Sequence, residues 1–358
     1  MKIKIAAEFF ASVLDRMSAV KPNANGEVSK CVLLEAKDGK LKVQKTDLSS
    51  YLSKVFAVDD ITEDGTVLVP FDLLYRFVKM NVGDLLLYTE GKKLYVVGSA
   101  GKSRFESLDI NTYPVPPSPA EYGEPSSVPS AVIAKVLDCE KFVAKKGYQN
   151  IGVYMGPRGV EAMDGLRMIT CKVGVSVPEM VLVPSLLRGL SLSNDIVAVY
   201  PILNGAGETK SLAIHDGDVE LICRILDSDF RDLSSIVNFD GKSVVTFPSE
   251  PFLKISKDIR SMSDVLDKKV RLSVEKGVVS FFAKTPTSET KMALTADGVD
   301  GEPTFSIALN CAFLVDAIEA LDVSDSVLMH YQSSNQAVKF TTPDGSTVCA
   351  VMPMNNIE

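Results

Sequence analysis

The run that most resembles a site of chemistry is Gly98–Ser103, whose sequence Gly-Ser-Ala-Gly-Lys-Ser matches the end of a phosphate-binding loop. That motif needs a glycine where this chain has Val96, and it needs a helix directly after it. The helix N-terminus matters because its amides and dipole bind the anion, whereas Arg104–Ser107 reads as a strand. We therefore predict a hairpin turn here. A nucleotide-binding enzyme or hydrolase stays open only as a rival from another class.

Cysteine and histidine are the remaining residue types that could hold a metal or act as a nucleophile or base. The six cysteines are far apart, lack C-x-x-C spacing and lie mostly in apolar runs, so we expect free, buried thiols. His215 precedes Asp216-Gly217-Asp218 in an expected polar turn, and His330 lies in an expected strand. Neither has catalytic partners at a diagnostic spacing. We expect no catalytic residue, metal or cofactor, and a function that is mechanical rather than chemical.

A repeated strand-to-helix unit organises the chain. Val67-Leu68-Val69-Pro70 returns as Val181-Leu182-Val183-Pro184, and a degenerate copy is Phe305–Asn310. Each copy is followed by apolar residues at helical spacing, and proline fits the first turn of a helix. In addition, Ala11–Asp15 is answered by Ala134–Asp138. Repeats of this length match domains rather than solenoid units.

We therefore predict three similar domains, at residues 1–122, 123–241 and 242–358, each of which is itself duplicated. The fold class is α+β, with helices on one face of antiparallel sheets. The proline-rich segment Tyr113–Ser130 is expected to be the first linker, with Pro129 opening the next helix. The six expected helices are residues 6–21, 70–80, 129–146, 184–190, 250–262 and 310–321.

The composition predicts a soluble, cytoplasmic protein without a membrane partner, because no apolar run approaches the ~18 residues that a membrane span needs. The net charge of −8 argues against nucleic acid at first. The expected helices, however, hold twelve basic and nine acidic residues, a net charge of +3, which leaves −11 for the rest. A basic helix layer inside an acidic shell is one reading, and chance scatter of solvated charges is the other.

Four short motifs, together with the three duplicated domains, resemble the bacterial DNA polymerase III beta subunit, the sliding clamp, over the whole chain. The most specific are Met163-Asp164-Gly165-Leu166-Arg167-Met168 and the ending Ala350-Val351-Met352-Pro353-Met354. The others are Thr46-Asp47-Leu48 and Ser103-Arg104-Phe105, which leads to Tyr113-Pro114.

This resemblance implies a non-catalytic processivity factor. Two chains would close head to tail into a ring around double-stranded DNA, with the helices on the inner side of the ring. The ring would contact the DNA without recognising its base sequence. The implied partners are the replicative DNA polymerase alpha subunit, the clamp loader and other clamp-motif proteins. The contact between the two chains is implied at Phe105, Ile259 and Met262, for which ordinary core is the alternative. A clamp-fold peptide-binding scaffold that does not encircle DNA is the main rival function.

Two further sets of site residues complete these expectations. DNA contacts are expected from the basic positions on the helices and from the loop around Lys145: Lys21, Arg76, Lys79, Lys135, Lys145, Lys146, Tyr148, Arg188, Lys254 and Lys257. The resemblance implies a pocket for an apolar partner peptide, in which flexible methionines can repack around different ligands. Its residues would be Met163, Gly165, Leu166, Arg167, Met168, Ile236, Val351, Met352, Pro353 and Met354. Family members commonly have histidine at the position of Leu166, threonine at that of Met163 and proline at that of Arg231. We therefore expect a more apolar pocket in this chain.

Overall fold

The computed structural model describes residues 1–24, 26–144, 152–205, 207–226, 230–239, 241–322 and 325–354. The chain forms two compact units. Unit 1 consists of Met1–Leu137 with Leu182–Asp227, and unit 2 of Asp138–Val181 with Ser228–Glu358. All strand pairs given for the described residues are antiparallel and helices are few, so the α+β class is confirmed. The three-domain division stays a prediction.

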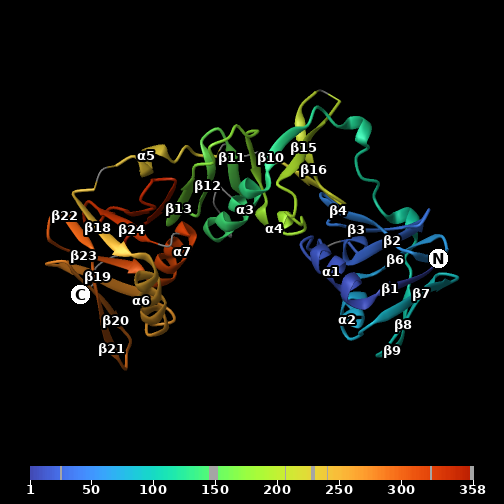
Figure 1. Ribbon diagram of the computed structural model, residues 1–358, viewed down its shortest axis with the longest axis horizontal. Helices are drawn as coiled ribbons and strands as arrows, with labels where there is room; N and C mark the ends of the chain where they lie inside the picture. Colours follow the sequence, from blue (N-terminus) through green and yellow to red (C-terminus); the bar gives the residue numbers. More distant parts are fainter. Residues whose placement is uncertain are drawn as a thin grey trace. The chain divides into compact units, whose positions relative to one another are not determined.

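Unit 1 contains two sheets (Figure 1). The first has the order β5-β1-β7-β8-β9, and the second, of eight strands, has the order β10-β15-β16-β17-β4-β3-β2-β6. The strands of the first are β1 (Lys2–Ala6), β5 (Asp60–Glu63), β7 (Asp84–Glu90), β8 (Lys93–Gly98) and β9 (Gly101–Glu106). Those of the second are β2 (Cys31–Lys37), β3 (Lys40–Thr46), β4 (Tyr51–Ala57), β6 (Gly65–Pro70), β10 (Ser126–Pro129), β15 (Ile196–Leu203), β16 (Thr209–Asp216) and β17 (Val219–Arg224).

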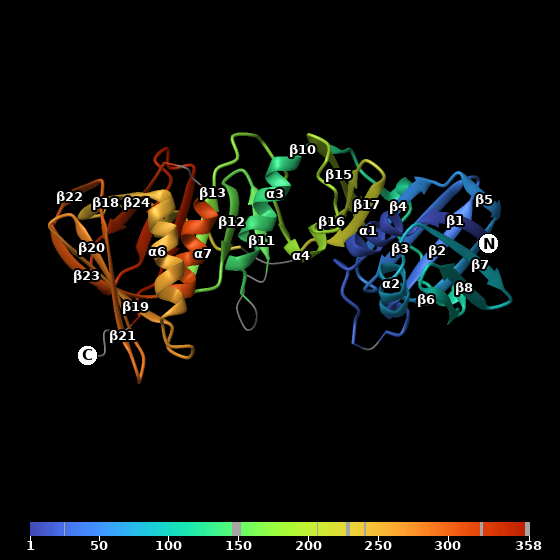
Figure 2. The ribbon, with the colours of Figure 1, turned by 60° about the horizontal axis from the view of Figure 1, so that its bottom comes forward.

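Helices α1 (Ala7–Met17) and α2 (Phe71–Lys79) pack side by side in unit 1, as both ribbon views show (Figures 1 and 2). Their apolar residues recur at helical spacing, which gives each helix one face to bury. Phe10 and Leu14 of α1 and Leu74 of α2 are fully buried there. The short helix α4 (Pro184–Leu187) also belongs to this unit.

Unit 2 likewise contains two sheets, in the orders β14-β11-β12-β13-β26-β25-β24-β18-β22 and β21-β20-β19-β23. The longer sheet is made of β11 (Val153–Gly156), β12 (Gly159–Met163), β13 (Arg167–Cys171), β14 (Met180–Leu182), β18 (Ser243–Pro248), β22 (Gly298–Gly301), β24 (Ser326–Tyr331), β25 (Val338–Thr341) and β26 (Thr347–Val351). The shorter sheet is made of β19 (Lys269–Glu275), β20 (Val278–Lys284), β21 (Glu289–Thr295) and β23 (Thr304–Asn310).

The core of unit 2 lies beneath helices α6 (Ser249–Ser261) and α7 (Cys311–Leu321), which pack side by side (Figure 2). Phe252 of α6 stacks on Phe247 of β18 with ring centroids 4.2 Å apart, and it also touches Phe281 and Phe340. All four rings are fully buried, and such aromatic contacts add to the stabilisation from area burial. The helix α5 (Ser234–Val237) is one turn long.

Between these elements, α3 (Ser130–Asp138) begins directly after Pro129 and runs into the 3₁₀ helix η4 (Cys139–Phe142). Three other 3₁₀ helices are η1 (Val28–Lys30), η2 (Ile110–Thr112) and η3 (Pro119–Glu121). None of the described helices is both long and apolar enough to cross a membrane.

The expected strand-to-helix units are confirmed, with shorter helices. Pro70 ends β6 and is the N-cap of α2 rather than a residue of its first turn, whereas Pro184 does open α4. The Gly98–Ser103 run is a hairpin, because β8 ends at Gly98 and β9 begins at Gly101. His215 lies in β16 rather than in a turn, and its Nε2 contacts Glu220 Oε1 at 2.8 Å. The six cysteines are free and buried, as expected.

The expected basic helix layer is wrong for the helices that the structure describes. Helices α1 to α7 carry seven basic and eight acidic residues, a net charge of −1. The difference arises because the helices end early: Lys21 and Arg188 lie beyond the ends of α1 and α4. Lys145 and Lys146 lie outside the described residues. The cations expected on helices are therefore partly on the loops that follow them.

Candidate functional site

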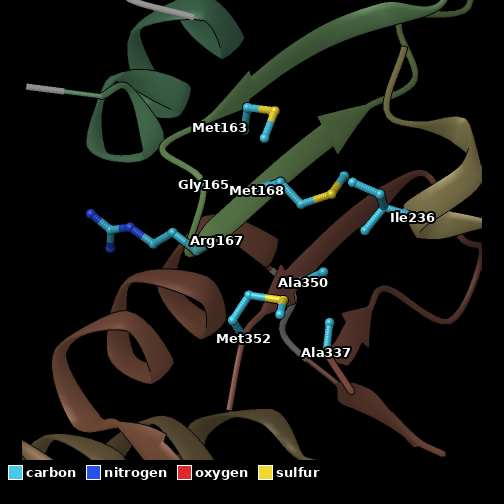
Figure 3. Close-up of a pocket in the computed structure, with 8 residues that line it drawn as sticks. All are labelled: Met163, Gly165, Arg167, Met168, Ile236, Ala337, Ala350 and Met352. Carbon is cyan, nitrogen blue, oxygen red and sulfur yellow. The ribbon is translucent and has the colours of Figure 1, made fainter. Parts of the chain in front are cut away.

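A pocket in unit 2 brings together six residues that the sequence assigned to a partner-peptide site (Figure 3). It has a volume of about 40 Å³. The six are Met163, Gly165, Arg167, Met168, Ile236 and Met352, and Ala337 and Ala350 also line it. The residues come from β12, β13 and the turn between them, from α5, from the residue before β25, and from β26 and the segment after it.

The turn between β12 and β13 is fixed by its own side chain. Asp164 Oδ1 accepts the backbone N–H groups of Leu166 and Arg167, both at 3.0 Å, and the Asp164 N–H donates to the Arg167 carbonyl. Gly165 has a φ of 86°, a left-handed conformation that favours glycine. An aspartate followed by glycine therefore specifies this turn, which explains why these residue types are needed here.

The C-terminal strand β26 completes the site by pairing with β13. Met168 lies opposite Ala350, and Arg167 opposite Val351. One residue further on, the Met352 N–H donates to the Leu166 carbonyl at 2.8 Å, which ties the end of the chain to the turn. Two segments about 185 residues apart thus meet through backbone hydrogen bonds. These bonds bring Met163, Met168 and Met352 to the same pocket.

The floor of the pocket is apolar. Met168 and Ala350 are buried with Leu233, and Met163, Ile236 and Ala337 pack against them. In Figure 3 the thioethers of Met163, Met168 and Met352 line the same hollow as Ile236. Met352 is 43% exposed. Because methionine side chains are long and unbranched, a small pocket of this kind can widen around an apolar ligand.

Arg167 holds the wall of the pocket and points away from the methionines (Figure 3). Its Nε donates to Asp164 Oδ2 at 3.0 Å, and its two Nη atoms donate to Asp316 and to the Lys141 carbonyl. The guanidinium also lies over the Phe313 ring, 4.3 Å from its centroid. These contacts join the turn to α7, and the charge of Arg167 is satisfied by partners within the protein. This wall of the pocket is therefore rigid, whereas the methionine side chains are adaptable.

The other residues assigned to this pocket lie beside it. Leu166 is exposed but does not line the hollow, and Val351 is buried in β26. Pro353 and Met354 are half-buried, and the Met354 N–H donates to the Ala308 carbonyl. Sequence reasoning missed Ala337 and Ala350. Small residues in strands form no recognisable sequence pattern. Pairing the C-terminal motif with the Met163–Met168 motif as neighbouring strands would, however, have identified Ala350.

The residues expected to contact DNA are mostly on the surface. Those exposed in the structure are Lys21, Arg76, Lys79, Arg188, Lys254 and Lys257, and Lys135 is half-buried. Lys257 Nζ pairs with Glu319 at 2.9 Å, and Lys141 pairs with the same carboxylate at 2.7 Å. The hydrogen bonds from these two lysines hold the pKa of Glu319 below its usual range. Lys145, Lys146 and Tyr148 lie outside the described residues.

The residues expected at the contact between chains differ in exposure. Phe105 of β9 is buried against Phe77, with ring centroids 6.4 Å apart, and Ile259 is fully buried in α6. These two side chains therefore already serve as core within one chain. Met262, the C-cap of α6, is 42% exposed and remains available to a second chain.

Comparisons with known proteins agree with this architecture. The family model for the DNA polymerase III beta subunit, C-terminal domain, matches residues 236–355. The beta sliding clamp of Pseudomonas aeruginosa is 20% identical over 97% of this chain and 96% of its own length. That of Rickettsia bellii is 22% identical over 98% of this chain and 96% of its own.

Solved structures give the same fold. The DNA polymerase III subunit beta from Pseudomonas aeruginosa superimposes with a TM-score of 0.82 at 18% identity, covering 99% of this chain and 100% of that one. The subunit from Borrelia burgdorferi, solved in complex with a natural product, has a TM-score of 0.85 at 15% identity and full coverage of both chains. Residues 236–355 thus match the C-terminal domain of the DNA polymerase III beta subunit, and the chain as a whole is similar from end to end to curated bacterial beta sliding clamps.

Proposed function

We propose that two copies of this chain close into a ring around duplex DNA and tether the replicative polymerase to it. The protein has no catalytic role of its own in this function. The observation that carries the proposal is a pairing between strands of successive repeats, here called a strand joint, which occurs twice within the chain. A further pair of strands that matches this pattern has open edges in the single chain. We place the protein in the cytoplasm, where bacterial DNA is replicated.

The two internal joints have the same construction. Each uses the strand at the end of a four-residue turn: β4 follows Asp47–Ser50, and β13 begins at Arg167, the last residue of the turn Asp164–Arg167. Each pairs this strand with the last strand of the next repeat, β4 with β17 and β13 with β26. In both turns the first N–H donates to the last carbonyl and the aspartate Oδ1 accepts two N–H groups from the turn.

A third copy of this turn and of the strand after it is present, but in the single chain that strand is not joined to the last strand of another repeat. The turn Thr285–Ser288 has the same backbone hydrogen bond, and Thr285 Oγ1 replaces the aspartate oxygen. The strand after it, β21, is an edge of its sheet, and so is β9, the last strand of the first repeat. An open edge of this kind offers unpaired N–H and C=O groups to another chain. By repetition, β21 of one copy pairs with β9 of a second, and two such joints close a two-chain ring.

The internal joints also supply the register of the third. The first residue after the turn lies opposite Ile222 in one joint and opposite Ala350 in the other: these pairs are Tyr51 with Ile222 and Met168 with Ala350. The equivalent position in β21 is Glu289. The equivalent position in β9 is Arg104, the third residue after Gly101, as Ile222 is the third after Val219.

Arg104 of one chain therefore faces Glu289 of the other. Both are exposed in the single chain and carry opposite charges, whereas the internal joints bury apolar pairs at this position. Opposite charges on directly opposed strand residues stabilise pairing by about 0.2–1 kcal/mol. A polar joint suits a ring that must open to admit DNA, because the opened edges stay soluble.

Several exposed cations support weak contact with DNA. A sliding protein needs few, long-range phosphate contacts and no base readout. Arg76 and Lys79 of α2 and Lys254 of α6 are exposed on helices. The net charge of −1 on the described helices keeps this attraction low. It is also the one observation that favours the rival function, a peptide-binding scaffold that does not encircle DNA.

The Met352 pocket supports the tethering part of the proposal. Its apolar floor and rigid arginine wall suit a short apolar peptide, such as one from the polymerase alpha subunit, the clamp loader or another clamp-motif protein. Its walls include Met163 where the family commonly has threonine, and Leu166 is exposed beside it where histidine is common. We therefore expect partner peptides with more apolar side chains than those of ordinary bacterial clamps.

A primer-extension assay tests the function. With the cognate polymerase and clamp loader, the protein should lengthen the products made per binding event on a primed circle. It should do so much less on short linear duplexes with open ends, because a ring slides off them. Equal stimulation on both templates would favour the scaffold. No stimulation on the circle, with loading demonstrated, would contradict tethering itself.

A further inference from the structure

Unit 1 contains a hollow of about 240 Å³ that shares two kinds of wall with the pocket around Met352, an aspartate turn and the end of the paired strand. Its walls come from the turn Asp47–Ser50, the residues at the end of β17, the segment after α1 and the start of α4. No role assigned above to the fold or to the peptide pocket uses this hollow.

The two hollows occupy equivalent positions in the two internal joints. Asp47 Oδ1 accepts the N–H groups of Ser49 and Ser50 at 2.9 and 2.6 Å, as Asp164 does in its own turn. In the adjacent strand, Arg224 is two residues beyond Ile222, and Met352 is two residues beyond Ala350. Arg224 therefore stands where the methionine anchor of the other pocket stands.

The chemistry of the second hollow differs from that of the first. Val183, Leu186 and Leu226 give it apolar walls, but Lys21 and Arg224 are exposed cations at its lining. Neither makes an ion pair with a described residue. The carboxylate of Asp47 already accepts bonds from its own turn, including the Ser49 hydroxyl at 2.9 Å. The hollow thus presents positive charge beside apolar surface, in a chain with a net charge of −8.

We propose that this hollow is a second docking pocket, which binds an extended partner segment that carries an apolar side chain next to a carboxylate side chain. The apolar group would fill the space between Leu186 and Leu226, and the carboxylate would bind Lys21 and Arg224. Duplex DNA matches the two cations but has no exposed apolar group for the hollow, since its outer surface is phosphate and sugar. Charge complementarity and apolar volume together therefore favour a peptide.

Methyl NMR on the full-length protein tests this with two probe peptides. One is a capped hexapeptide of glycine and serine that contains a single aspartate followed by leucine, and the other has asparagine instead of aspartate. We expect the aspartate peptide to shift the methyl signals of Val183, Leu186 and Leu226 and to bind about fivefold more tightly than its neutral twin. This advantage should shrink as salt is added.

Paired variants identify the charges responsible. Lys21→Gln with Arg224→Gln should make the two peptides bind equally, whereas Lys37→Gln with Lys40→Gln removes the same charge at an exposed turn and should change nothing. Equal binding of both peptides to the parent protein would overturn the proposal. So would shifts centred on the Ile236 methyl, which reports the Met352 pocket. Displacement of the aspartate peptide by a short DNA duplex that shifts the same methyls would assign the two cations to DNA instead.

Discussion

Replacing Arg104 by glutamate is expected to separate the two-chain ring into single chains at concentrations where the parent is paired. The change places two glutamates opposite each other at each joint, and a ring contains two joints. Loss of an attractive pair and creation of a repulsive one costs about 0.4–2 kcal/mol per joint. The dimer dissociation constant should therefore rise by about fourfold to several hundredfold, because 1.4 kcal/mol corresponds to a factor of ten.

The decisive comparison is the exchanged pair. Arg104→Glu combined with Glu289→Arg restores opposite charges across the joint, so we expect a dimer mass close to that of the parent, by sedimentation or light scattering on chains of 38.7 kDa. Lys37→Glu is the matched control, since it reverses an exposed charge on β2, away from the β9 and β21 edges. If Arg104→Glu alone leaves the dimer intact, or the exchanged pair fails to restore it in a folded protein, the register is wrong.

Replacing Met352 by alanine is expected to weaken binding of a polymerase-derived peptide at least tenfold. A truncated anchor in a peptide site typically costs ~2 kcal/mol or more, whereas a rim residue costs under ~1 kcal/mol. Met352 follows β26 and is 43% exposed, so the substitution should leave folding and the dimer mass unchanged. Fluorescence anisotropy with a labelled peptide measures the effect.

Leu203→Ala is a suitable control for this experiment, because Leu203 is equally exposed, at 42%, but lies in unit 1. The sign of the change is informative. Unchanged affinity would mean that the C-terminal motif is structural, and higher affinity would mean that Met352 obstructs the pocket. Leu166→His should shift peptide preference toward that of ordinary clamps, since it returns a polar group to the edge of an apolar site.

The sequence predicted the strand-to-helix units well because their signals are local. The runs ending at Pro70 and Pro184 combine a β-branched strand with apolar residues at helical spacing. The ends of the helices were less predictable. Lys21 and Arg188 were expected within helices, but the chain leaves the helix before each of them. This displacement lowers the expected helix charge from +3 to +1, which shows how strongly a charge count depends on element boundaries.

The candidate pocket was predictable only where a motif exists. The Asp164-Gly165 turn and the terminal methionines stand out as residue types with a specific use. Ala350 and Ala337 do not, because their contribution is a small side chain at a strand position that long-range pairing selects. The register proposed for the joint between two chains could likewise not be read from the sequence, since it follows only from comparing the turns and the pairings β4–β17 and β13–β26.

Retention on circular DNA tests encirclement most directly. The protein is loaded onto a nicked plasmid by its clamp loader, isolated by gel filtration at moderate salt, and the plasmid is then cut once. We expect the protein to stay with the circle and to leave soon after the cut, and end-blocked linear DNA should retain it. A protein that remains on open linear DNA, or that salt removes equally from circles and open linear molecules, would contradict a closed ring around DNA.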